Sequence, residues 1–116
     1  MSIKRLIKDA QTQVREVDPA TIAAHLKHHL VVDVREPNEV LLGFLPGAIN
    51  VPRGTMEFRV SDDPRFGDPQ RAILVYSGSG KRSALAALTL SQLGFSNVQS
   101  LAGGIKRWSE ENGPIE

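Results

Sequence analysis

The 116-residue chain is 41% hydrophobic and 23% charged, which is typical of one soluble globular domain, and it contains no apolar run of the roughly 18 residues that a membrane helix needs. Its 14 basic and 13 acidic side chains leave a formal net charge of +1, so neither nucleic acid nor a membrane is an expected partner. Because cysteine is absent, disulfides, thiolate metal sites and a thiol nucleophile are excluded. We expect a single domain over residues 1–116 that uses no metal and no cofactor.

Residues 1–17 are expected to form an extension made of a helix and a first strand. The strand is the weaker segment QVREV at 13–17. No secretory signal is present, and Asp9 and Glu16 argue against a mitochondrial presequence, so we expect a cytoplasmic location. The apolar residues at helical spacing are Ile3, Leu6, Ile7, Ala10, Val14 and Val17, whereas Lys4, Arg5 and Lys8 lie on other faces.

Strand and helix patterns alternate along the remaining chain. We predict helices over 17–27, 82–95 and 103–113, the first with Asp18 as N-cap, the second beginning near Ser83 and closed by Gly94. Residues 53–59 predict an amphipathic helical turn, and 59–71 a surface loop. Strands are predicted at 30–34, 48–51, 72–76 and 97–101. The alternation predicts an α/β fold with about five parallel strands, of which 72–76 is central.

The segment VYSGSGKRSALAAL, residues 75–88, predicts an anion-binding loop at the carboxyl end of that central strand. Glycines at 78 and 80 allow successive amides to turn inward, and the following helix adds free amides and its positive dipole end. Lys81 and Arg82 add full charges. The alternative is an ordinary strand-to-helix turn that uses glycine for its geometry alone.

Other familiar sites do not match these residues. The loop lacks the GxxxxGK[ST] pattern of a nucleotide P-loop and the GxSxG pattern of a hydrolase nucleophile elbow. His25 and His29 are four residues apart, but no third metal ligand is apparent, so we interpret the histidines as a solvated helix end. The pairs Asp62/Asp63 and Glu110/Glu111 are adjacent in sequence and do not form a catalytic dyad.

Three segments together resemble the single-domain rhodaneses, the thiosulfate sulfurtransferase family. They are VVDVREPNEVLLGFLPGAINVP at 31–52, ILVYSGSGKRSALAALTLSQLGFSNVQSLAGGIKRW at 73–108, and the closing NGPIE. The DVRE, PGAINVP, GxRS and GGxxxW elements occur in family order. The resemblance implies a rhodanese-like α/β fold with a five-stranded parallel sheet flanked by helices on both faces.

The resemblance also implies a catalytic position. Family members usually carry cysteine where this chain has Ser77, and that cysteine takes a sulfane sulfur from thiosulfate or a persulfide donor and passes it to a thiol or protein acceptor. Arg82 matches the family's loop arginine, five residues after Ser77, whereas related phosphatases have a loop one residue longer. The implied anion-binding loop consists of Gly78, Ser79, Gly80, Lys81, Arg82 and Ser83.

Residues outside the loop are weaker site candidates. We expect Asp33 to anchor backbone amides, and Arg35 to pair with Glu36 or to line the crevice. Arg53 is placed at the pocket mouth by topology alone. Trp108 is expected in the core, and Phe44, where the family often has histidine, is a tolerated change.

Serine at position 77 leaves two functions open. A hydroxyl cannot become anionic near neutral pH as a thiol can, and it cannot store a persulfide, so the chain is expected to be inactive. The first function is a sulfurtransferase domain whose nucleophile has been replaced. The second is a natural non-catalytic module that binds an anion or a partner protein.

Overall fold

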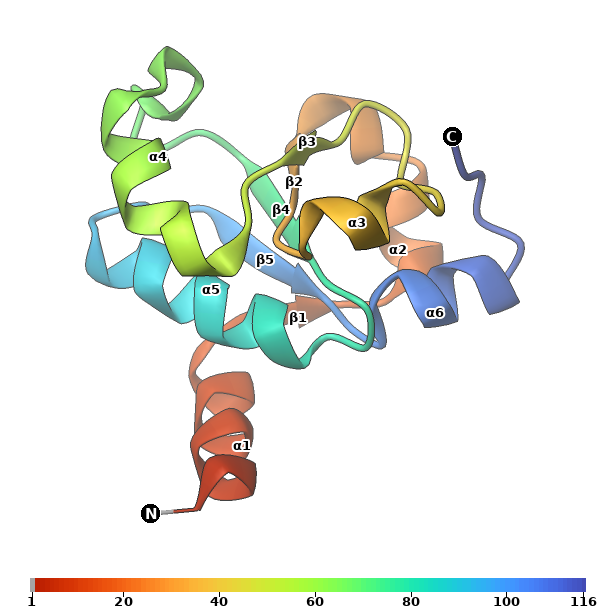
Figure 1. Cartoon of the computed structure of the whole chain (residues 1–116), viewed down its shortest axis with the longest axis horizontal. Coiled ribbons are helices and arrows are strands. Elements are labelled where there is room, and N and C mark those ends of the chain that lie inside the picture. The colour runs from red at the N-terminus through yellow and green to blue at the C-terminus, as the bar shows by residue number, and fades with distance from the viewer. Residues whose placement is uncertain (1) are drawn as a thin grey trace.

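The fold is built on one sheet, seen in a computed structural model that describes residues 2–116. All strand pairs are parallel and the order is β1-β5-β4-β2-β3, which confirms the predicted fold class (Figure 1). β4 lies at the centre, as its apolar sequence predicts. The strands are β1 (Arg15–Val17), β2 (Leu30–Asp33), β3 (Ile49–Asn50), β4 (Ile73–Tyr76) and β5 (Val98–Leu101).

Helices cover both faces of the sheet, with α4 and α5 on one face and α2 and α6 on the other (Figure 1). The helices are α1 (Ile3–Gln13), α2 (Pro19–Ala23), α3 (Pro37–Val40), α4 (Met56–Asp62), α5 (Lys81–Gln92) and α6 (Gly104–Glu110). Short 3₁₀ turns occupy Leu26–His28, Arg53–Thr55 and Pro64–Phe66. In the part of the chain described, no helix is long and apolar enough to cross a bilayer.

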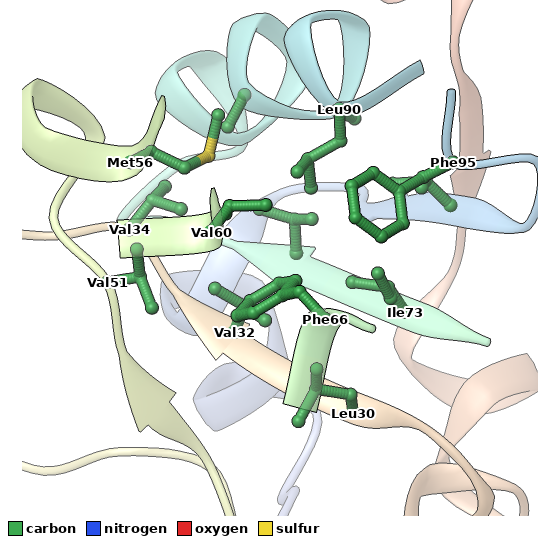
Figure 2. Close-up of a cluster of buried hydrophobic side chains, with 14 residues drawn as sticks. Leu30, Val32, Val34, Val51, Met56, Val60, Phe66, Ile73, Leu90 and Phe95 are labelled. Atoms are coloured by element: carbon green, nitrogen blue, oxygen red, sulfur yellow. The ribbon is translucent and has the colours of Figure 1, made fainter. Parts of the chain in front are cut away.

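The hydrophobic core lies in two layers because successive side chains of a strand point to opposite faces. Ile73 and Val75 face α4 and α5, where the Phe66 and Phe95 rings meet edge to face at 6.1 Å (Figure 2). Leu74 faces the opposite layer, which contains α2 and α6, with Trp108 fully enclosed. The placement of Trp108 in the core is therefore confirmed.

Several predicted boundaries were wrong for local reasons. The helix expected over 17–27 ends at Ala23 and continues only as a 3₁₀ turn, and its N-cap residue Asp18 accepts a hydrogen bond from Arg107 instead of capping. The strand expected at 13–17 begins at Arg15, because α1 extends to Gln13. The loop expected over 59–71 contains the end of α4 and a 3₁₀ turn that buries Phe66.

The α3 helix was not predicted, although its signal is present in the sequence. Pro37 occupies its first turn, and Glu36 and Glu39 form a reciprocal capping box across its start. The helix is only four residues long, so no apolar periodicity marks it. It matters because it holds Glu39 beside the loop that follows β4.

Candidate functional site

The loop after β4 comprises Ser77–Gly80 and leads directly into α5, which begins at Lys81 rather than near Ser83. Gly80 is the N-cap and has a φ of +94°, a conformation that L side chains rarely adopt. A Cβ at Gly80 would lie 3.2 Å from Gly103 N and from Leu101 O, so the loop packs closely against the β5–α6 connection. Glycine is thus required here both for backbone conformation and for space.

Two backbone amides of the loop converge on the side chain of Ser77. The N–H groups of Gly80 and Ser83 each donate to Ser77 Oγ at 3.2 Å. Both amides belong to the start of α5, whose dipole places further positive potential at this point. The loop therefore concentrates positive potential on the γ atom of residue 77.

Three serine hydroxyls form a small hydrogen-bond network around the side chain of residue 77. The Ser77 hydroxyl donates to Ser83 Oγ at 3.4 Å, and Ser83 Oγ in turn donates to Gly80 O at 3.2 Å and lies 2.8 Å from Ser100 Oγ. Ser77 is only 1% exposed, so its oxygen is satisfied from within the protein. With serine at this position, the loop binds its own hydroxyl.

The two loop cations differ in their surroundings. Lys81 is exposed. Arg82, expected to supply its charge to the loop, instead makes a bidentate pair with Glu39 at 2.8 and 2.9 Å. Hydrogen bonds from Arg82 and from the Glu36 backbone hold the pKa of Glu39 at about 2. The guanidinium nonetheless stays next to the loop, since its Nη2 lies 3.7 Å from where a Gly78 Cβ would be.

Asp33 and Arg35, at the end of the neighbouring strand β2, form a buried ion pair. Arg35 donates to both carboxylate oxygens of Asp33, at 2.8 Å in the shortest contact, and Asp33 Oδ1 also accepts the Arg35 backbone amide. The remaining guanidinium contacts go to Gly43 O and Glu39 O. The expected pairing of Arg35 with Glu36 is therefore wrong, whereas Asp33 does anchor a backbone amide.

The pKa values around this pair follow from burial and charge. Burial opposes the charge on Arg35, but the hydrogen bonds and negative charge of Asp33 outweigh it and raise the Arg35 pKa. Burial also raises the pKa of Tyr76 above its usual range, so that its hydroxyl stays neutral and accepts the Leu45 amide. Asp33, Arg35 and Tyr76 act as a structural clamp beneath the β2 loop.

The remaining residues to place are the weak site candidate Arg53, together with Phe44 and the histidines, which were not expected to act in the site. Arg53 is committed to Glu57 and Thr89 and lies on the α4–α5 side. Phe44 pairs through its backbone with Glu116, which ties down the carboxyl end of the chain. His25 and His28 are exposed beside a 3₁₀ turn, and the structure over residues 2–116 contains no group of three side chains that could hold a metal.

Sequence reasoning missed Gly104 and Glu39. Gly104 has a φ of +61°, and a Cβ there would lie 2.5 Å from the carbonyl oxygens of Ser77 and Gly78. The first amides of α6 bind those same carbonyls, Ile105 N to Ser77 O at 2.9 Å and Lys106 N to Gly78 O at 3.1 Å. In the sequence, the contact at Gly104 is signalled by the paired glycines at 103–104. The position of Glu39 is signalled by the capping box that it forms with Glu36.

This arrangement can stabilise one negative charge at the γ atom of residue 77. A thiolate or persulfide there would accept hydrogen bonds from the same two amides that now donate to the hydroxyl. Serine lacks that chemistry, because its hydroxyl is neutral near pH 7.

Comparison with known sequences places the chain among sulfur-transfer proteins. Residues 18–111 match the family described as Rhodanese-like domain. A sulfurtransferase from Allochromatium vinosum is 33% identical over 105 residues, covering 88% of this chain and 94% of that protein. Thiosulfate sulfurtransferase 16, chloroplastic, from Arabidopsis thaliana is 32% identical over 113 residues, covering 84% and 93%.

Solved structures agree on the fold. A protein of unknown function from Rhodopseudomonas palustris, described as a possible tyrosine phosphatase, superposes with a TM-score of 0.93 at 30% identity and covers 100% of this chain and 95% of its own. The polysulfide-sulfur transferase homodimer of Wolinella succinogenes superposes with a TM-score of 0.81 at 27% identity, covering 97% and 85%. Sequence and structure comparisons thus point to the same group of proteins.

Proposed function

Since this chain belongs to the rhodanese-like domain family, we propose that its loop is built for sulfane-sulfur transfer through a sulfur atom at residue 77, and that the chain with Ser77 does not turn over. The donor class is thiosulfate or a persulfide, and the acceptor is a thiol. Support comes from one feature above all, the pair of amides at 3.2 Å from Ser77 Oγ.

The proposed reaction explains why those amides lie there. A thiolate at position 77 attacks the sulfane sulfur of thiosulfate, the S–S bond breaks, and sulfite leaves with the electron pair. An acceptor thiolate then attacks the outer sulfur of the resulting persulfide and regenerates the thiolate. Negative charge rests on the side chain of residue 77 before and after each transfer, where preorganised amides stabilise it most.

Serine at position 77 blocks the reaction at its first step. Amides and a helix N-terminus can lower a thiol pKa from about 8.5 to roughly 3.5–7.5, whereas a hydroxyl starts too high to be ionised by the same surroundings. The neutral Ser77 hydroxyl also accepts hydrogen bonds from both amides, and the residue is buried. The loop is thus configured for an anion that this side chain does not supply.

Phosphate-ester hydrolysis, suggested by the description of the Rhodopseudomonas protein, fits less well. Arg82 is held by Glu39 in a bidentate pair, whereas a phosphoryl group would need that guanidinium. The loop is also one residue shorter between position 77 and its arginine than in the related phosphatases.

The proposal is tested by the Ser77→Cys variant. We expect it to gain one sulfur atom in mass after incubation with thiosulfate, to transfer that sulfur to cyanide, and not to hydrolyse p-nitrophenyl phosphate. The unchanged chain should do none of these. A mass unchanged by thiosulfate, or turnover by the serine form, would contradict the proposal.

A matched control separates the loop from a thiol in general. Ser91→Cys places a thiol near the end of α5, where Ser91 Oγ donates to Ala87 O, far along the chain from the converging amides. It should remain free of sulfane sulfur at neutral pH. Equal loading of both variants would show that the loop contributes nothing.

A second function is an anion-binding module without chemistry, and the observation in its favour is that the Gly80 and Ser83 amides still converge at residue 77 when that residue is serine. Calorimetric titration of the chain with thiosulfate and sulfate tests it. If Arg82 joins the site, Arg82→Ala should weaken binding by roughly 1.5–3 kcal/mol, the value of a charge-assisted hydrogen bond. Equal affinity in both proteins would remove Arg82 from the site.

A further inference from the structure

α1 presents an apolar stripe of which only one half is covered. Ala10 is completely buried and Val14 packs against the core beside α5. One and two turns earlier on the same stripe, Ile7 is half-buried and Ile3 is 79% exposed. Figure 1 shows the reason, because the amino-terminal half of α1 extends away from the body of the molecule.

The uncovered half forms one wall of a groove of about 560 Å³. The other wall is Lys81, the first residue of α5, which directly follows the loop at Ser77. The lining residues are Ile3, Lys4, Ile7, Lys8, Gln11 and Lys81. The lining thus combines two isoleucines with three lysines and includes no acidic side chain among the described residues.

We propose that this α1–α5 groove is a docking site for an acidic segment of another protein, with apolar side chains between its acidic residues. The apolar side chains would cover Ile3 and Ile7, and the carboxylates would meet Lys4, Lys8 and Lys81. Charge complementarity selects this occupant, since the lining lysines would attract acidic groups and repel basic ones. A bound segment would lie beside the loop, but the proposal does not require sulfur transfer at residue 77.

Two other occupants fit less well. In a two-fold symmetric dimer each groove would meet the same surface of its copy, which would bring lysines against lysines. A lipid bilayer is flat, whereas Ile3 and Ile7 line a hollow that they share with Lys81 of another helix. Both alternatives are outcomes of the experiment.

Selection from a random dodecapeptide library on the immobilised full chain tests the proposal. Clones that also bind the Lys4→Glu/Lys8→Glu variant are discarded, and the retained peptides are synthesised and titrated into ¹⁵N-labelled protein. We expect retained sequences rich in Asp, Glu and apolar residues, amide shifts confined to α1 and Lys81, and a loss of affinity of about tenfold in the variant. An empty selection, retained peptides without acidic residues, or shifts elsewhere would overturn the proposal.

A matched variant controls for net charge alone. Lys27→Glu/Arg71→Glu reverses two exposed basic residues outside the groove and should retain affinity within about twofold. Ile3→Ser should weaken binding without loss of folding, because that side chain is 79% exposed. If the unmodified chain binds phosphatidylglycerol vesicles through Lys4 and Lys8, or forms a dimer that Ile3→Ser abolishes, the groove belongs to a membrane or to a second copy.

Discussion

The loops that follow β2 and β4 stand side by side at the carboxyl edge of the sheet, yet they hold charge in opposite ways. After β2, two opposite charges neutralise each other: Arg35 pairs with Asp33, and two carbonyl oxygens accept its remaining hydrogen bonds. After β4, main-chain amides converge on Ser77, which carries no charge. The β2 loop therefore holds a closed ion pair, whereas the β4 loop directs two backbone amides at an uncharged side chain.

The parallel register makes these two loops neighbours. Asp33 is paired with Tyr76, so the residues after each strand emerge together. Their meeting point is the contact between Glu39 and Arg82, where the β2 side neutralises a cation of the β4 side. Substitutions in the β2 pair, in the β4 loop or at the Glu39–Arg82 contact should therefore affect the protein to different degrees.

The largest effect is expected from breaking the clamp. Asp33→Ala would leave the Arg35 guanidinium buried without its counter-charge, and loss of one partner of a buried pair typically costs about 3–5 kcal/mol. Urea denaturation of both proteins measures the change. Asp63→Ala is the control, because Asp63 binds Arg65 with the same two-residue spacing near the surface, and it should cost far less. Equal losses would show that burial of the pair is unimportant.

The next largest effect is expected from Gly104→Ala, which disturbs the contact between the start of α6 and the β4 loop. The new methyl group would clash with the carbonyls of Ser77 and Gly78, costing roughly 1–3 kcal/mol of overpacking, in addition to roughly 1–2 kcal/mol for the left-handed backbone. Gly94→Ala also places a side chain on a backbone of positive φ, at +103°, but with open space around it. In a Ser77→Cys background, Gly104→Ala should also lower sulfur loading and Gly94→Ala should not. If neither substitution changed sulfur loading, the contact at Gly104 would not be needed to hold the loop.

A smaller loss is expected from Ser83→Ala, which opens the hydroxyl network. Ser100 Oγ and the Ser77 hydroxyl would lose the partner that Ser83 Oγ provides, at about 1–3 kcal/mol for unsatisfied buried groups, whereas Gly80 O would keep the Ala84 amide. Thermal or urea unfolding measures it. Ser91→Ala on the exposed part of the same helix should change stability by less than about 0.5 kcal/mol. Indistinguishable variants would argue that the network does not hold the loop.

The smallest effect concerns the link itself. Glu39→Gln should cost less than about 1 kcal/mol, since the Arg82 and Glu39 side chains are 40% and 36% exposed. Because the folded pKa of Glu39 is about 2 against an ordinary 4.5, its contribution is present above pH 4.5 and is lost as the pH falls towards 2. The stability difference between the two proteins should close over that interval. A difference that persists below pH 2 would assign it to something other than this carboxylate.

The sequence was informative where a local pattern carries a local consequence. The apolar run at 72–76 predicted the central strand, and the glycines at 78 and 80 predicted a loop in which amides turn inward. It failed for contacts between distant segments: Glu39 against Arg82 joins positions 43 apart. The start of α5 was placed too late because a serine is a stronger N-cap signal than the glycine that occupies the position.

By itself the sequence determined the alternation of strands and helices, the parallel sheet and the lack of a thiol, because side-chain period, glycine and composition act within short stretches of chain. Only the tertiary structure decided which charged side chains pair with one another and which apolar side chains are covered. It turned Arg35 toward Asp33 and Arg82 toward Glu39, and it left Ile3 on α1 uncovered. Such pairings depend on the register of the sheet and on where each helix packs, and these are set by the burial of the whole core.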